Sequence, residues 1–309
     1  MNIGELIHKN RPTLKESTIN RYESQLNILK NMFDTETYDF LKNFDEVVDK
    51  LKDKNYLTAR NYYNSIIVLL LALDEDKDLI EKYVELRDKL NEKYSDSQTD
   101  NISEKQSKNF ASIEEVNLML DTMMKEIKLK KLKSKGDLNG KEKELVMMYT
   151  MFSMLKFIPT RNDLSGMVLT TPSLYKYQSK EINYLVIGRN KMYYMLNQYK
   201  TNKTYGIDKK IDVPADLMKI VRMYLRATDK KTGDVLFTTS TGNPIIRNVM
   251  SQMLLKTSKK YMGKSVSSTM MRKIVVSDKF SDLKKEQVKY ADMMGHSTAT
   301  MDKIYIKDN

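Results

Sequence analysis

The chain has 309 residues, of which 30% are charged and 40% hydrophobic, and this composition is typical of a soluble protein with room for two ordinary domains. It contains no cysteine and two histidines, which excludes disulfides and cysteine-based zinc sites and argues against an imidazole-rich metal site. The apolar run Ser65–Leu73 is far shorter than the roughly 18 residues that a membrane span needs, and no secretory signal segment opens the chain. We therefore expect an intracellular protein.

The net charge of +12 is unevenly distributed along the chain. Residues 1–100 contain 15 of the 53 basic residues and 20 of the 41 acidic ones, so that residues 101–309 carry a net charge of +17. A basic domain of this kind attracts polyanions. A lysine-rich composition in general would give the same excess, so charge alone leaves nucleic-acid binding open.

The first hundred residues predict a small bundle of about four helices. Apolar residues recur at helical spacing in the segments 13–33, 38–53, 57–73 and 78–94. Ser17 or Thr18 is the expected N-cap of the first helix, because a short hydroxyl side chain can accept a hydrogen bond from the first helical turn.

A polar stretch at 95–109 has no apolar periodicity and predicts a linker. We therefore place a helical domain at 1–97, a linker at 98–110 and a second domain at 111–309. In the second domain we expect helices at 112–133 and 141–157, three strands at 182–188, 191–199 and 206–214, and helices again from about Ala215. The expected fold is mainly α, with a helical bundle followed by an α+β domain that holds a small three-stranded antiparallel sheet.

Five polar residues of the second domain occupy positions that suggest chemistry. They are Arg161 after a helix in "PTRNDLSG", Lys200 at the turn between the second and third strands, Arg272 in "SVSSTMMRK", and His296 and Tyr305 in "GHSTATMDKIY". Each feature alone is common in proteins. The four motifs in this order, with a lysine carried by a strand turn, form a far more specific pattern.

This order and context resemble the tyrosine recombinase family, the phage-integrase type of site-specific DNA recombinase. The catalytic domain of that family carries an arginine, a lysine on a β-hairpin, a His-x-x-Arg motif, and Gly-His followed nine residues later by the nucleophilic tyrosine. The segment Gly295–Tyr305 matches the last motif in residue type and spacing. The N-terminal bundle is similar to the core-binding domain of the family, so the resemblance covers nearly the whole chain.

The resemblance implies a role for each of the five residues. Tyr305 attacks phosphorus and forms a 3′-phosphotyrosyl bond, which conserves the bond energy, so that no ATP is needed for rejoining. The resemblance implies no cofactor and no metal. Arg161 and Arg272 hold the non-bridging phosphate oxygens. Lys200 protonates the leaving 5′-oxygen, and His296 hydrogen-bonds the phosphate. The implied partners are double-stranded DNA and further copies of the chain, which assemble as a homotetramer on DNA.

The nine-residue spacing also predicts a local structure. On one continuous helix nine residues turn through about 900°, which would put His296 and Tyr305 on opposite faces. We therefore expect the helix to break between them, with Ser297, Thr298 or Thr300 as the new N-cap. At the first arginine, Thr160 or Asn162 is expected to cap the following helix.

The His-x-x-Arg motif is not intact, because Thr269 stands three residues before Arg272 and the only other histidine is His8. Thr269 can hydrogen-bond a phosphate oxygen, but it cannot usefully accept a proton. General-base catalysis is typically worth about 10²–10⁴-fold, so we expect a slower enzyme. Related type IB topoisomerases carry lysine at this position, so histidine is not mandatory for the chemistry.

Two further points stay open. Lys203 lies in the same turn as Lys200, and "YKTNK" resembles the strand-ending Lys-Thr of the family, which favours Lys200 as the general acid. Many family members continue past the tyrosine with a helix that docks on a neighbouring subunit, whereas only residues 306–309 follow here. One hypothesis is that the free protein is a monomer that assembles only on DNA.

Three functions are compatible with these residues. The leading interpretation is a site-specific recombinase or integrase of a mobile element or virus. A type IB DNA topoisomerase uses the same tyrosine chemistry, but small viral topoisomerases begin with a β-rich domain rather than a helical bundle. The third alternative is a catalytically inactive DNA-binding relative, which Thr269 motivates and the retained Tyr305 argues against.

Overall fold

The computed structural model describes residues 2–97, 107–133 and 137–306. The chain forms two compact units, Met1–Ile102 and Ser103–Asn309, here called the first and the second unit. The linker expected at 98–110 lies mostly outside the described residues. In the part of the chain that the structure describes, no helix has the length and apolar character needed to cross a membrane.

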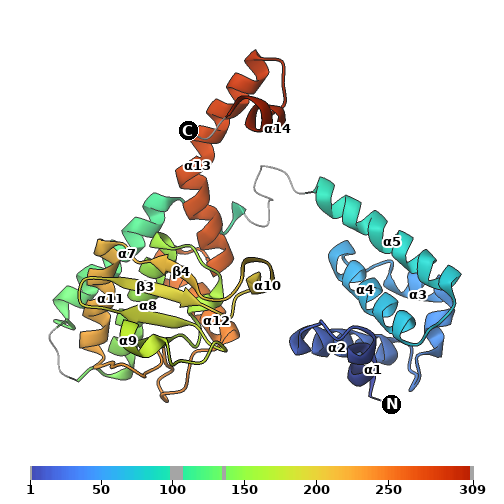
Figure 1. Cartoon of the computed structure of the whole chain (residues 1–309), viewed down its shortest axis with the longest axis horizontal. Helices are drawn as coiled ribbons and strands as arrows, with labels where there is room; N and C mark the ends of the chain where they lie inside the picture. Colours follow the sequence, from blue (N-terminus) through green and yellow to red (C-terminus); the bar gives the residue numbers. More distant parts are fainter. Residues whose placement is uncertain (1, 98–106, 134–136, 307–309) are drawn as a thin grey trace. The chain divides into compact units, whose positions relative to one another are not determined.

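The first unit is a helical bundle built around α4 (Figure 1). Its helices are α1 (Ile3–Asn10), α2 (Glu16–Met32), α3 (Phe44–Leu51), α4 (Tyr56–Ala72) and α5 (Lys77–Asp96), with a 3₁₀ turn η1 (Asp39–Lys42). Residues Ser65–Leu70 of α4 are all buried, because α1, α2 and α5 pack around this helix. The predicted bundle is confirmed, and the apolar run is core rather than membrane.

Two details of the first unit differ from the expectation. Helix α1 was not predicted, since its eight residues are too few for a clear periodicity. The expected caps Ser17 and Thr18 are wrong, because α2 begins at Glu16 with Lys15 in the N-cap position. The extended backbone of Lys15 starts the helix there, and its side chain makes no capping hydrogen bond within the described residues.

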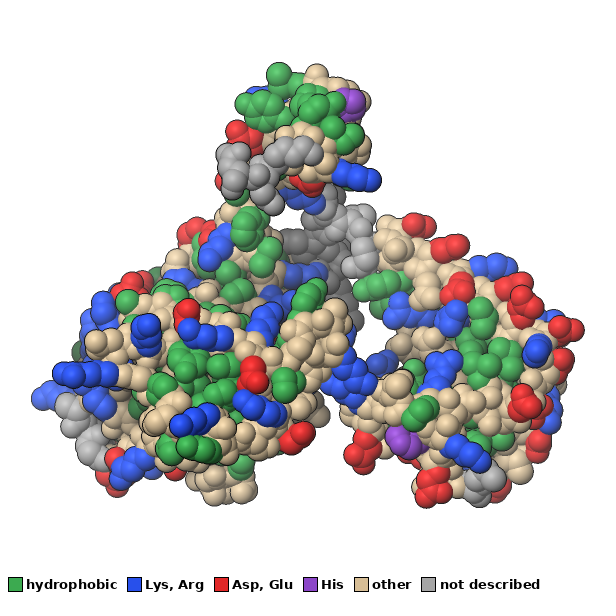
Figure 2. Space-filling view, viewed as in Figure 1, with side chains coloured by type: hydrophobic (Ala, Val, Ile, Leu, Met, Phe, Trp, Pro, Cys, Tyr) green, Lys and Arg blue, Asp and Glu red, His purple; other side chains and the backbone are tan. Residues whose placement is uncertain are grey.

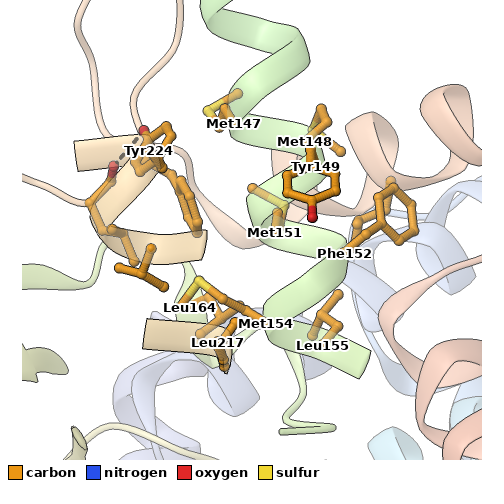
Figure 3. Packing of buried hydrophobic residues seen from close by; sticks show 14 of the residues in the cluster. Met147, Met148, Tyr149, Met151, Phe152, Met154, Leu155, Leu164, Leu217 and Tyr224 are labelled. Atoms are coloured by element: carbon orange, nitrogen blue, oxygen red, sulfur yellow. Dashed lines mark hydrogen bonds between the residues drawn. The ribbon is translucent and has the colours of Figure 1, made fainter. Parts of the chain in front are cut away.

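The second unit is organised around α8 (Gly140–Phe157), every residue of which from Leu145 to Leu155 is buried. Figure 3 shows the large side chains of α8 projecting to more than one side of the helix. The helices that contact it are α7 (Ile113–Leu129), α11 (Ala215–Ala227), α12 (Arg247–Met262) and α13 (Ser268–Met293). Asn139 and Glu142 form a capping box that fixes the start of α8.

A small sheet lies on the same unit, with strand order β1-β2-β3-β4. Its strands are β1 (Val168–Thr170), β2 (Tyr184–Ile187), β3 (Met192–Leu196) and β4 (Lys209–Asp212), and short helices α9 (Pro172–Tyr175) and α10 (Asn202–Tyr205) lie in the connections. The predicted antiparallel set is confirmed in β2, β3 and β4. The expectation of three strands was nevertheless wrong by one, because β1 pairs in parallel with β2 and forms a fourth strand at the edge of the sheet. Three residues carry too little pattern to reveal such a strand.

Two buried tyrosines of this unit provide a matched test of the core. The hydroxyl of Tyr194 has no hydrogen-bond partner among the described residues, and burial raises its pKa. The hydroxyl of Tyr224 donates to the carbonyl oxygen of Leu236 at 2.8 Å. A buried hydroxyl without a hydrogen-bond partner lowers the free energy of unfolding, whereas a buried hydroxyl that forms a hydrogen bond raises it.

We expect Tyr194→Phe to raise the free energy of unfolding by about 1 kcal/mol, and Tyr224→Phe to lower it by a similar amount. Urea denaturation of both variants beside the unchanged protein measures the two shifts. A clear loss of stability in Tyr194→Phe would contradict the assignment and would reveal a buried water bonded to that hydroxyl.

Candidate active site

Arg161 lies at the junction between α8 and a short 3₁₀ turn, η2 (Asn162–Leu164). Pro159 follows α8 closely and cannot continue a helix. The expectation that Thr160 or Asn162 caps the next helix is wrong, because half-buried Arg161 occupies the cap position. The amide of Asn162 instead donates to the carbonyl oxygen of Arg247 at 3.2 Å and to another side chain of α12.

The carboxylate of Asp163 is paired with one arginine and feels the charge of two more. Asp163 is only 7% exposed, and a guanidinium nitrogen of Arg247 lies 3.5 Å from its Oδ1. Burial raises the pKa of Asp163 above its ordinary value. The charges of Arg247, Arg161 and Arg272 oppose this shift but do not cancel it. Arg161 and Arg272, which are 111 positions apart in the chain, therefore act on one carboxylate. We call these four residues the arginine cluster.

Lys200 is tied to this cluster through the end of β3. The carbonyl oxygen of Gln198 accepts hydrogen bonds from Arg247 at 3.3 Å and from the amide of Asn183 at 3.0 Å. The same amide of Asn183 donates to the carbonyl oxygen of Asp163 at 3.0 Å. Asn183 is buried, so the turn that begins two residues after Gln198 has a fixed place beside the cluster. Lys200 itself is exposed.

Lys203 lies three residues further on, in α10, and is also exposed. The hydroxyl of Tyr199 donates to the carbonyl oxygen of Gly206 at 2.6 Å and closes this connection between β3 and β4. Both lysines thus belong to one short connection, and the geometry does not choose between them.

Thr269 and Arg272 lie in the first turns of α13. Ser267 is the N-cap, and its hydroxyl accepts a hydrogen bond from the backbone N–H of Met270 at 3.2 Å. Residues three apart on a helix are neighbours on one face. The exposed Thr269 therefore lies on the same side of α13 as Arg272. A histidine at position 269 would lie on that side too.

His296 and Tyr305 come together at the other end of α13. The helix ends at Met293, and Gly295 adopts a φ of 67°, which a residue with a side chain adopts at a cost. Ser297 caps the next helix, α14 (Thr298–Thr300), by accepting a hydrogen bond from the N–H of Thr300 at 3.1 Å. The predicted helix break is confirmed, and so is Ser297 as its cap.

A π-helical turn, η3 (Met301–Tyr305), completes this C-terminal structure. It places the hydroxyl of Tyr305 3.2 Å from Nε2 of His296, with the two rings stacked at 5.5 Å. The imidazole can accept the phenolic proton through this contact or donate to the oxygen, depending on its tautomer. We call residues 295–306 the tyrosine tip.

The structure does not bring the tyrosine tip to the arginine cluster. Arg272 and Ala291 are 19 residues apart on the same helix, which corresponds to roughly 28 Å along the axis. The N–H of His296 donates to the carbonyl oxygen of Ala291 at 2.9 Å, so the tip lies at that distance. In Figure 1, α13 extends away from the rest of its unit and carries α14 at its far end.

Sequence reasoning missed Asp163, Asn183 and Arg247. Asp163 stands two residues after Arg161, but isolated acidic residues are too common to give a signal. The contacts of Asn183 and Arg247 cross many residues of chain, from 15 to 85, so no local pattern could have revealed them.

No protein-family model matches the chain, and no curated protein matches it. Among the solved structures that resemble it, two match nearly the whole length of this chain. One is the integrase of the Tn1549 transposon in complex with transposon right end DNA, with 16% identity, a TM-score of 0.55, and coverage of 100% of this chain and 96% of that one. The other is the XerH site-specific recombinase bound to its difH substrate in a pre-cleavage complex, with 12% identity, a TM-score of 0.51, and coverage of 99% and 85%. The chain therefore has the fold of the tyrosine recombinases.

Proposed function

We propose that this protein is a site-specific DNA recombinase or integrase of a mobile element or virus, which cleaves and rejoins DNA through a 3′-phosphotyrosyl intermediate. The observation that carries the proposal is that Arg161 and Arg272, far apart in the sequence, both lie close enough to the buried Asp163 for their charges to lower its pKa, in a chain with the recombinase fold. Two guanidinium groups held in this way can bind the non-bridging oxygens of one phosphate and stabilise the charge that develops there.

The reaction requires a nucleophile, a proton acceptor and a proton donor. The Tyr305 oxygen attacks phosphorus, the bond to the 5′-oxygen breaks, and Lys200 protonates that oxygen as it leaves. A phenol is mostly protonated at neutral pH, and the group in contact with the Tyr305 hydroxyl is His296 at 3.2 Å. Attack of a 5′-hydroxyl on the phosphotyrosyl bond reverses the step and rejoins a strand.

Double-stranded DNA is the proposed partner, with a homotetramer assembled on it. The net charge of +17 in residues 101–309 supports contacts with phosphates, which release counterions on binding. Thr269, in place of the histidine of the family motif, favours a second candidate, a DNA-binding relative that has lost catalysis. The helical first unit gives less support to a type IB topoisomerase.

The first prediction concerns the covalent intermediate. Incubation with nicked duplexes that carry candidate sites, followed by denaturation, is expected to yield a protein–DNA adduct that migrates more slowly in a gel. Tyr305→Phe removes the nucleophilic oxygen and should abolish the adduct while DNA binding persists. Tyr177→Phe, at another exposed tyrosine of the second unit, is the control and should form the adduct normally. Binding without an adduct on any substrate would support the inactive relative.

The second prediction distinguishes Lys200 from Lys203. Lys200→Ala should lower cleavage of ordinary DNA by roughly 10²-fold or more, the usual contribution of a general acid, and Lys203→Ala should change it little. A substrate with sulfur in place of the scissile 5′-oxygen leaves as a thiolate and needs no proton, because thiols are far more acidic than alcohols. Cleavage of this substrate should be restored in Lys200→Ala. Rescue of Lys203→Ala instead would reverse the assignment.

Burial raises the pKa of Asp163 above its ordinary value of 3.8, and this makes a pH-dependent stability effect testable. A raised pKa means that the folded state favours the neutral acid more than the unfolded state does. The free energy of unfolding therefore falls as the pH rises from about 4, where the unfolded chain ionises, through the raised pKa of the folded state. Asp163→Asn keeps the shape without the charge. The variant should therefore become more stable relative to the unchanged protein over that pH range in urea denaturation.

The same variant should lose activity, because Arg161, Arg247 and Arg272 then repel one another without a counter-charge. We expect a roughly tenfold lower adduct rate, equivalent to about 1.4 kcal/mol in the barrier. A variant with unchanged pH dependence and unchanged adduct rate would show that Asp163 does not organise the cluster.

A further inference from the structure

The connection between β3 and β4, residues 199–208, is held at its second end by side chains outside the arginine cluster. Asp208 lies where this connection returns to the sheet. Its Oδ1 accepts hydrogen bonds from Nζ of Lys180 at 2.7 Å and from the hydroxyl of Tyr175. Nζ of Lys180 also donates to the hydroxyl of Tyr175 at 3.1 Å. We call Tyr175, Lys180 and Asp208 the hairpin clamp.

Tyr175 is the best supported member of the clamp. It ends α9, and its ring meets the ring of Tyr184, a buried residue of β2, edge-on at 5.5 Å. Nζ of Lys180 lies 4.1 Å from the centroid of the Tyr175 ring, so that a cation–π contact adds to the hydrogen bond between the two side chains. The clamp therefore ties Asp208 to groups that lie 28 and 33 residues earlier in the chain.

The backbone of Asp208 is held by a separate contact. Asp208 has a φ of 59°, in the left-handed region, which costs free energy for a residue with a side chain. The buried Asn197, directly after β3, accepts a hydrogen bond at Oδ1 from the N–H of Asp208 at 2.9 Å, and its Nδ2 donates to the carbonyl oxygen of Ile182 at 2.8 Å. A strained backbone persists only where its surroundings determine it, and here they do so from two sides.

The two ends of the connection are thus held by different groups. Its first end follows Gln198, whose carbonyl oxygen bonds to Arg247 and to Asn183. Its second end is Asp208, in the clamp. A connection held only at its first end would keep backbone entropy in every residue that is not fixed. The clamp therefore decides how closely the connection that carries Lys200 keeps a single conformation.

The clamp depends on one carboxylate in basic surroundings. Figure 2 shows many more basic than acidic side chains on the visible face of the second unit, which carries the sheet. The hydrogen bond from Lys180 lowers the pKa of Asp208, and the same hydrogen bond raises the pKa of Lys180. Both groups are therefore charged at neutral pH. Removal of the carboxylate leaves Lys180 and Tyr175 without the acceptor that they share, so the clamp should open.

We propose that Tyr175 and Lys180 are positioning residues for the general acid. By holding Asp208, they keep the connection between β3 and β4 in the conformation that brings Lys200 to the leaving 5′-oxygen. This inference rests on the proposed function and adds no chemical step, because the proton still passes from Lys200 to the 5′-oxygen as the bond to phosphorus breaks. A small displacement of a catalytic group loses much of its contribution to the rate.

The test compares ordinary DNA with DNA that has sulfur in place of the scissile 5′-oxygen, in the adduct assay. Asp208→Asn removes the charge and keeps a residue type that tolerates the left-handed backbone. It should lower the adduct rate on ordinary DNA about tenfold, a part of what a general acid contributes. On the sulfur substrate, whose leaving group needs no proton, the rate should stay within about twofold of that of the unchanged protein.

Asp212→Asn is the matched control. Asp212 lies on β4, four positions beyond Asp208, and its carboxylate pairs with Nζ of Lys210 at 3.1 Å. The substitution removes the same charge and also breaks an ion pair, but it should leave both rates unchanged. Equal losses on the two substrates in Asp208→Asn would overturn the positioning role, because a defect in folding or in DNA binding does not depend on the leaving group.

Variants of Lys180 test the ammonium group itself. Lys180→Met removes the charge and should reproduce the selective loss on ordinary DNA, whereas Lys180→Arg keeps a cation that binds carboxylates and should restore the rate. In a Lys200→Ala background, Asp208→Asn should cause no further loss on ordinary DNA, because residues that act through one another are not additive. A further tenfold loss there would show that the clamp does not act through Lys200.

A measurement on the free protein separates this inference from the proposed function. Hydrogen exchange followed by mass spectrometry should show faster exchange in residues 199–208 of Asp208→Asn than in the unchanged protein or in Asp212→Asn. Equal exchange in the three proteins would overturn the clamp while leaving the proposed function standing. Faster exchange together with no adduct from the unchanged protein would reject the proposed function, and the positioning role with it.

Discussion

The candidate site depends on the electrostatic interaction of Asp163 with three arginines, of which Arg247 is in contact with it. Three guanidinium groups repel one another, and a buried carboxylate is costly without positive charge. The structure meets both constraints at once, because Asp163 is only 7% exposed and Arg161, Arg247 and Arg272 all act on it. The raised pKa indicates that burial still outweighs the attraction, so the arrangement costs stability in return for a preformed cationic site.

Asn183 extends this constraint to the sheet. Its buried amide bonds the backbone of Asp163 and of Gln198, and its Oδ1 accepts from the N–H groups of Asn197 and Gln198 at 2.8 Å. The loop with Arg161 and the end of β3 therefore cannot shift independently. Preorganised donors stabilise developing charge without reorganisation during the reaction, and the exposed Lys200 begins its turn from this fixed point.

The sequence predicted the parts of this structure that local pattern determines. The periodic helices, the strands β2 to β4 and the cap at Ser297 are confirmed, because each follows from residues within one segment. The caps expected at Ser17, Thr18, Thr160 and Asn162 are wrong, since a hydroxyl or amide near a helix start competes with tertiary contacts. Asn162, for example, bonds α12 instead. The role of Arg247 and the separation of Tyr305 from Arg272 depend on tertiary packing and on the straightness of α13, which no motif encodes.

In the proposed reaction, the hydrogen bond between Tyr305 and His296 would reduce the consequence of the threonine at position 269. A histidine there would place a proton acceptor in the first turns of α13, near Arg272. Here the imidazole in contact with the phenol belongs to the tyrosine tip, 3.2 Å from the hydroxyl, and it moves with the nucleophile. The tyrosine tip thus holds both the proposed attacking oxygen and a group that can accept its proton. In the proposed reaction, His296 would take the phenolic proton that a histidine at position 269 would otherwise take, so the threonine there would slow the reaction less than the loss of the general base.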